Sequence, residues 1–218
     1  AALLSLSCAS AGYHAPAFPY AAGRHRIIAV LPFEMVFAGK RPSGLTAHGV
    51  AQIEEQESLA FQASLYDALL ERSGWGPGRI YIGIQPIRKT NRILADTGIP
   101  IRDVWYMAPE ELARILGVDA VVHTRVTTTR YISNLASAGI EIGSVIVDEA
   151  TDHRIGWALP WGLTKTYDIH AESSLFDGWD GNLLWRVADD RETDWHVSAT
   201  DVIHGVNHFL AKHFPYRG

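Results

Sequence analysis

Cysteine is almost absent from this chain of 218 residues, in which Cys8 is the only one. A single cysteine cannot close an intrachain disulfide, and it also excludes a zinc site built on cysteine pairs. Basic residues are too few to outweigh the acids, and a net charge of −5 offers little attraction to a phosphate backbone. We therefore expect no nucleic acid among the partners. No apolar run reaches the roughly 20 residues that a membrane-spanning helix requires.

The sequence also lacks the common catalytic motifs. Neither a G-x-S-x-G nucleophile turn nor an H-E-x-x-H zinc motif occurs anywhere in the chain. The glycine-rich stretch GWGPGR at 74–79 follows a predicted helix and precedes a predicted strand. A phosphate-binding loop has the opposite order, since it follows a strand and opens a helix. We therefore expect a protein that is not an enzyme and that carries no cofactor.

What the chain does contain is typical of one folded domain. Hydrophobic residues make up 47% and charged residues 20%, which is ordinary for a globular protein of this length.

The first residues have the composition of a processed export signal. Residues 1–6 are apolar enough for the end of a signal peptide, and Ser7 is the small residue that lipoprotein processing requires before a cysteine. The stretch from Ala9 to Gly23 is small, aperiodic and rich in proline and glycine, as a tether is. We predict a signal-peptide remnant at 1–7, lipidation at Cys8, a lipidated tether at 8–24 and one domain at 25–218. The alternative is a cytoplasmic N-terminus with an incidental cysteine.

Hydrophobic periodicity predicts alternating strands and helices. We expect strands at 25–33, 79–87, 118–131, 163–176 and 183–187, and helices at 52–73, 91–99, 108–117 and 194–214. Pro32 closes the first strand, and a loop is expected from Glu34 onward. The order β-α-β-α-α-β-(insertion)-β-β-α predicts an α/β (α+β) sandwich, with a mixed sheet of about five strands covered by helices.

Two short motifs have clear structural roles. In LARILGVDAV, Gly117 ends a helix directly before an inner strand. In LFDGWDGNLLW, the turn residues Asp177, Gly178 and Gly181 supply the backbone angles of a tight hairpin, and Trp185 fills the core behind it.

Three segments resemble one superfamily in their order and spacing: RIIAVLPF, ELARILGVDAVVHTRV and DIHAESSLFDGWDGNLLWR. Together they resemble envelope lipoproteins related to the curli secretion channel protein CsgG and to the amino-terminal domain of TolB. The resemblance implies a compartment and an interaction role, and it supplies no catalytic residues.

The insertion at 132–162 lies between the second and third of these segments, where relatives of the curli channel contribute hairpins to a membrane-spanning barrel. Its second half alternates, so that four apolar side chains share one face: Ile155, Trp157, Leu159 and Trp161. A hairpin of this kind is long enough to reach the 9–11 residues of a transmembrane strand, but Pro160 would remove a ladder hydrogen bond. Contact with a partner or a membrane surface, plain packing on the domain, and a pore strand all remain open.

Histidines suggest the remaining chemistry. His204 and His208 are four residues apart on the predicted last helix, with His196 or His213 nearby, but no acidic base lies between them. Asp168, His170, Glu172 and His123 fall on the polar face of the sheet, where no concave pocket is expected.

These observations predict a non-enzymatic envelope lipoprotein on the periplasmic side of the outer membrane. It would act as an accessory or assembly component of a secretion or cell-surface-structure system, through contacts with envelope proteins and possibly with itself. The alternatives are an oligomeric outer-membrane secretion pore that uses the 132–162 insertion, and a metal-dependent enzyme that uses the C-terminal histidines.

Overall fold

The computed structural model describes residues 12–39, 46–129, 166–194 and 198–218. Its elements follow in this order: β1 (Tyr13–His14), α1 (Phe18–Ala22), β2 (Ile27–Val30), β3 (Glu34–Phe37), α2 (Ala47–Glu71), β4 (Gly83–Ile84), α3 (Ile87–Asp96), α4 (Ile101–Val104), α5 (Pro109–Leu116), β5 (Ala120–Thr128), β6 (Thr166–Asp177), β7 (Leu183–Asp194) and α7 (Ala199–Lys212). None of the helices in these ranges is long and apolar enough to cross a membrane.

The strands of the described residues form one mixed sheet. Its order is β1-β7-β6-β5-β2-β4, and β3 pairs with the second half of β5. β5 is parallel to β2 and β3 and antiparallel to β6, which in turn is antiparallel to β7. The predicted α/β sandwich is confirmed, although the sheet has seven strands where about five were expected.

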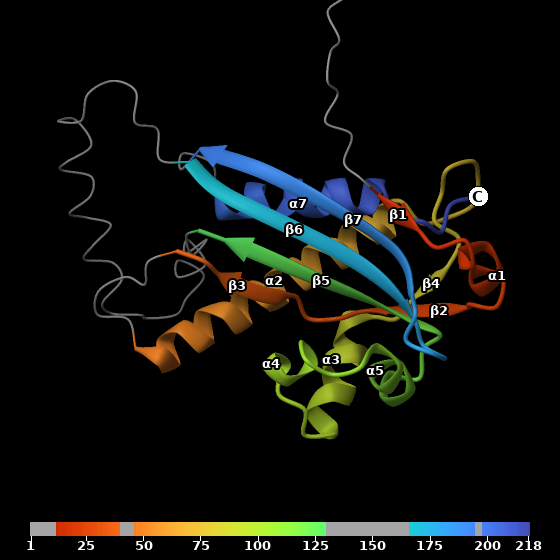
Figure 1. Cartoon of the computed structure of the whole chain (residues 1–218), viewed down its shortest axis with the longest axis horizontal. Helices are drawn as coiled ribbons and strands as arrows, with labels where there is room; N and C mark the ends of the chain where they lie inside the picture. Colours follow the sequence, from red (N-terminus) through yellow and green to blue (C-terminus); the bar gives the residue numbers. More distant parts are fainter. Residues whose placement is uncertain (1–11, 40–45, 130–165, 195–197) are drawn as a thin grey trace, which may run out of the picture.

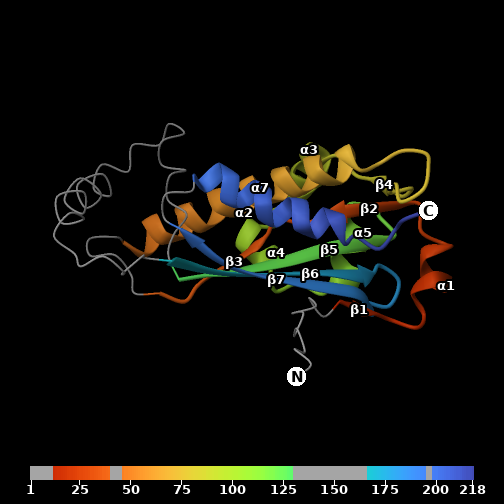
Figure 2. The same ribbon diagram turned by 90° about the horizontal axis from the view of Figure 1, so that it is seen from above.

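Helices cover the two faces of the sheet unequally. α2 and α7 run side by side along one face, and α3 to α5 gather near β2 and the start of β5 (Figure 1, Figure 2). Along β5, Val122, Thr124 and Val126 are fully buried, whereas Arg125 between them is exposed. On the face opposite α2 and α7, the part of the sheet that lies away from α3 to α5 is therefore the more open surface.

Pro32 does not end the first strand region, as the sequence suggested. β2 pairs with β5 at Ile28 to Val30, and β3 then continues along the same strand from Glu34, opposite Arg125. The prediction of a loop from Glu34 onward is wrong for residues 34–37. Proline removes one donor, but it leaves the chain free to rejoin the same neighbouring strand.

The N-terminal segment is folded from residue 13 onward, where an irregular tether was predicted over 8–24. The amide of Ala15 donates to the Leu184 carbonyl at 2.8 Å, beside the pairing of β1 with β7. Ala21 and Ala22 of α1 are buried in the core. Small residues reach buried positions without any periodic pattern, which is why the sequence did not reveal this. Cys8 and the residues up to 11 lie outside the described ranges.

The region after α2 also differs from the prediction. The strand expected at 79–87 is reduced to β4 at 83–84, and the next helix begins at Ile87 with Pro86 before it. Asn91, at the expected start of that helix, instead lies inside it and exchanges hydrogen bonds with Gln62 of α2.

Two local predictions are confirmed in detail. α5 begins at Pro109 and ends at Leu116, and the capping residue Gly117 has a left-handed φ of 67°. β6 and β7 form the predicted hairpin, with Ile169, Ala171 and Leu175 buried on one face.

Candidate interaction surface

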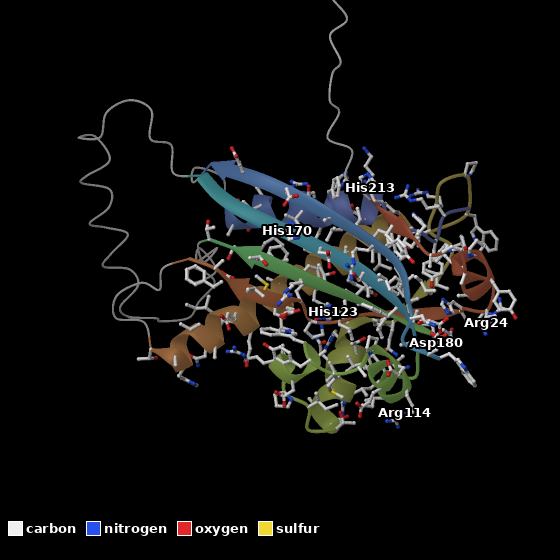
Figure 3. The ribbon with its side chains drawn as sticks, viewed as in Figure 1. Arg24, Arg114, His123, His170, Asp180 and His213 are labelled. Carbon is white, nitrogen blue, oxygen red and sulfur yellow. The ribbon has the colours of Figure 1, made fainter. Side chains whose placement is uncertain are left out.

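The uncovered face of β5, β6 and β7 carries most of the ordered polar side chains of the sheet. We call it the open face and define it by His123, Arg125, His170, Glu172, Arg186 and Asp190. Figure 3 shows His123 on β5 and His170 on β6.

Opposite charges alternate across the open face. Arg125 Nη2 lies 3.0 Å from Glu34 Oε1, and Arg186 Nε lies 3.4 Å from Glu172 Oε1. His170 Nδ1 lies 2.6 Å from Asp190 Oδ1 on the neighbouring strand. Cross-strand pairs of opposite charge stabilise a sheet modestly and fix its register. The pattern presents a polar surface whose charges largely neutralise one another.

Glu34 and His123 form the least solvated part of this surface. Glu34 is only 7% exposed, and burial raises the pKa of its carboxyl group, whereas Arg125 opposes the shift. Burial also lowers the pKa of His123, and Arg125 adds to that effect. A neutral His123 leaves Arg125 as the cation that compensates Glu34.

The sequence placed Asp168, His170, Glu172 and His123 on one polar face of the sheet, and the structure places His123, His170 and Glu172 on the open face, each with a different partner. Glu172 lies opposite Arg125 in the strand register, and His123 lies opposite Ser174. His170 bonds to Asp190 on β7. The side chain of Asp168 is outside the described part of the structure. His123 and His170 therefore have different partners.

A buried polar cluster at the other end of the sheet was missed by sequence reasoning. His25 Nδ1 lies 2.5 Å from the Tyr216 hydroxyl, and its Nε2 lies 3.6 Å from Asp177 Oδ2. Burial lowers the pKa of His25 against the opposing effect of Asp177, and burial raises the pKa of Tyr216. The cluster joins the start of β2, the end of β6 and the C-terminal residues. No local motif could reveal it, because 191 positions separate His25 from Tyr216.

The turn between β6 and β7 places its motif residues as follows. Asp177 is buried, and its carboxylate accepts a bond from the Trp179 amide at 2.8 Å. A side chain at Gly178 would clash, because its Cβ would lie 2.7 Å from the Asp119 carbonyl oxygen. Gly181 has a φ of 69°, which favours glycine. Trp185 is buried and meets Phe214 edge-on at 5.7 Å.

The candidate metal histidines lie on the exposed face of α7. The rings of His204 and His208 are 6.0 Å apart, but Arg72 Nη2 lies 2.8 Å from His208 Nε2. His213 instead contacts the Phe209 carbonyl through Nδ1 at 2.9 Å. No group of three potential metal ligands occurs among the residues that the structure describes. His196 lies outside them.

The outer edge of β7 is the most consequential feature of this surface. β1 pairs only with Trp185 and Arg186, and no other strand of the described ranges pairs with β7 on that side. The Leu184 carbonyl points toward β1, since it accepts the Ala15 amide. Backbone groups alternate in direction along a strand, so those of Ala188, Asp190 and Glu192 also point outward. Among the residues that the structure describes, the edge from residue 187 onward therefore presents backbone donors and acceptors that no strand pairs.

Acidic side chains accompany this edge. Asp190 and Glu192 are exposed beside it. On the helix-covered face, Arg191 pairs with Asp189 and donates to the Gly205 carbonyl at 2.8 Å, which ties the strand to α7. Charged side chains on an edge strand discourage indiscriminate pairing, while leaving the edge available to a complementary segment.

The four apolar residues of the predicted insertion face also lie outside the described ranges: Ile155, Trp157, Leu159 and Trp161. Their predicted contact role therefore stays a prediction, as does lipidation at Cys8.

Comparisons with known proteins give structural likenesses at low sequence identity. No protein-family model and no curated protein matches the chain. Among solved structures, lipoprotein GNA1162 from Neisseria meningitidis is 16% identical, with 85% of this chain and 94% of that chain covered and a TM-score of 0.48.

Two further structures are similar to this chain. The PelC dodecamer from Paraburkholderia phytofirmans is 12% identical, with 94% and 95% of the two chains covered and a TM-score of 0.43. The LpoB C-terminal domain from Salmonella enterica is 8% identical, with 78% and 84% covered and a TM-score of 0.35. Likenesses at these scores do not decide a function, which has to be argued from the residues of this chain.

Proposed function

We propose that this chain is an envelope lipoprotein that works without catalysis, as an assembly component that docks a partner protein. The observation that carries the proposal is the outer edge of β7. Its outward backbone groups beside Asp190 and Glu192 pair with no strand in the described ranges, and they are suited to accept an extended segment of another protein as an added strand.

Charge narrows the choice of partner. Two copies paired edge to edge would bring Asp190 and Glu192 of each chain close to the acids of the other, and like charges on paired strands are destabilising. A segment that carries lysine or arginine would instead meet these acids with opposite charge. We therefore favour an extended, basic segment of an envelope protein as the occupant.

The compartment in this proposal is the periplasmic side of the outer membrane, within a secretion or cell-surface-structure system. Its support is the sequence around Cys8: a small residue before the cysteine, an apolar stretch ahead of it, and no aspartate directly after it. Metabolic labelling with a palmitate analogue tests this part, because Cys8→Ser should abolish the label.

Photo-crosslinking in the producing cells tests the docking edge. A benzophenone amino acid at Glu192 should form a discrete adduct with a partner, whereas the same group at Arg92, on the exposed surface of α3, should not. In the same Glu192-labelled protein, Ala188→Pro should abolish the adduct without unfolding the protein. Its amide points outward, so proline blocks strand addition but removes no hydrogen bond to β6.

The outcomes separate clearly. Loss of the adduct in Ala188→Pro, with an unchanged melting temperature, supports docking by strand addition. An adduct that survives Ala188→Pro, or equal adducts from Glu192 and Arg92, would contradict it.

A further inference from the structure

Large aromatic side chains are exposed at the end of the molecule that contains α1 and the C-terminus. Trp75 is fully exposed, Tyr20 is 75% exposed and Tyr81 is 55% exposed. Tyr20 belongs to α1, and Trp75 and Tyr81 belong to the segment between α2 and β4. In Figure 1 α1, this segment and the C-terminus lie at one end of the fold.

Buried Tyr216 holds these segments together. Its ring lies 5.4 Å from that of Phe18 in α1 and 6.0 Å from that of Tyr81. The Tyr81 amide donates to the Tyr216 carbonyl at 3.3 Å, and the Gly78 amide donates to the Gly218 carbonyl at 2.8 Å. Tyr20, Trp75 and Tyr81 therefore belong to segments that pack together at one end of the fold, which we call the aromatic end.

The loop that carries Trp75 is shaped by glycine. Gly74, Gly76 and Gly78 have φ values of 133°, 127° and 72°, which other residues rarely adopt. The Gly74 amide donates to the Ile80 carbonyl at 3.1 Å, and the Arg79 amide donates to the Gly76 carbonyl at 3.1 Å. The backbone of this loop is hydrogen-bonded at its base, and the indole at its tip is left in solvent.

Positive charge gathers on the same segments. Residues 12–26, 72–81 and 211–218 contain no aspartate or glutamate, although the net charge of the whole chain is −5. Their cations are Arg24, Arg26, Arg72, Arg79, Lys212 and Arg217. The Arg24 guanidinium lies 5.1 Å from the centre of the Tyr20 ring and 3.6 Å from Asp177. These three ranges are therefore aromatic and basic, and the acids that contact them are Asp177, against Arg24, and Asp119, which accepts from the Arg26 amide.

We propose that the aromatic end seats the domain on the interface of an anionic phospholipid bilayer. Tryptophan and tyrosine favour the headgroup region because each combines an apolar ring with a polar group. Lysine and arginine near an anionic leaflet add electrostatic attraction.

A bilayer fits this surface better than a protein pocket does. The three aromatic side chains come from two segments, α1 and residues 72–81, and a compliant interface receives protruding rings without a matching cavity. The residues before Gly12 also join the fold beside exposed Tyr13. An anchor at Cys8 would lie at most about 14 Å of extended chain from Gly12. Binding of the aromatic end to a bilayer does not require that anchor, and the experiment below omits the acyl group.

Vesicle sedimentation tests the proposal with the full chain carrying Cys8→Ser, so that no acyl group contributes. The protein should sediment with phosphatidylethanolamine–phosphatidylglycerol vesicles and much less with phosphatidylcholine vesicles. Trp75→Ala should weaken binding by about tenfold, through the loss of one buried aromatic ring. Tyr106→Ala is the matched control, because Tyr106 is 77% exposed but follows α4, away from this end.

A charge variant tests the electrostatic part. Arg26→Gln with Lys212→Gln should weaken binding to the anionic vesicles by roughly fivefold for each cation removed at low salt. Melting temperatures of all variants should match that of the parent protein, since these side chains are exposed. The proposal is overturned if the parent does not sediment with anionic vesicles, or if Trp75→Ala and the charge variant bind as the parent does. Because no partner protein is present, the result is independent of the docking edge on β7.

Discussion

Tyr216→Phe removes one hydroxyl group from the buried polar cluster that joins the two ends of the chain. The Tyr216 side chain is completely buried, and its hydroxyl lies 2.5 Å from His25 Nδ1. Burial raises the pKa of Tyr216, so the hydroxyl stays protonated and donates to the imidazole. His25 Nε2 is then left to face Asp177 at 3.6 Å. Phenylalanine keeps the ring contacts but leaves Nδ1 buried without its donor.

The expected cost follows from that unsatisfied nitrogen. A buried polar group that loses its partner costs about 1–3 kcal/mol of folding free energy. For a chain of this length each kcal/mol lowers the melting temperature by about 2–4 °C. Urea denaturation at neutral pH, followed by circular dichroism, measures the loss directly. Tyr81→Phe is the control, because the Tyr81 ring also contacts Tyr216 but the residue is mostly exposed, and it should stay within about 0.5 kcal/mol. A loss in Tyr216→Phe no larger than in Tyr81→Phe would refute this account of the cluster.

Three further predictions concern stability. Burial lowers the pKa of His25 in the folded state, so the unfolded state binds a proton first as the pH falls. The melting temperature should therefore drop below about pH 6.5, and it should drop less steeply in His25→Gln. Gly117→Ala should cost about 1 kcal/mol in urea denaturation, because φ is 67° there but no atom lies within 4 Å of the added Cβ. Arg125→Ala should cost about 0.5–1 kcal/mol at pH 7.5, an amount reduced by the exposure of Arg125. Burial raises the pKa of Glu34, so this deficit should shrink as the pH falls through that pKa, and an equal deficit at pH 7.5 and 4.5 would contradict the pairing.

Local patterns predicted the parts of the fold that are decided locally. Gly117 ends α5 because a left-handed residue is needed directly before the strand, and the β6–β7 hairpin follows from its turn residues and clean alternation. The sequence placed a loop after Pro32, because proline usually interrupts a strand. Pairing with β5 restores the strand from Glu34 onward, and only the neighbour in space determines that.

The candidate surfaces were harder to predict, because they depend on topology. Whether β7 is an inner strand or an edge cannot be read from its own residues; it depends on how little of it the short strand β1 covers. The local pattern of the GWGPGR stretch only excludes a phosphate loop. Its exposed indole becomes meaningful once the packing around Tyr216 brings α1 beside it.

Hydrogen exchange along β7 tests the central claim most directly. In the purified protein, the outward amides of Ala188, Asp190 and Glu192 should exchange quickly, and the inward amides of Asp189 and Arg191 slowly. In envelopes isolated from the producing cells, docking by strand addition predicts that the outward amides become slow as well. Equally fast exchange of those three amides in the purified protein and in the envelopes would contradict the account.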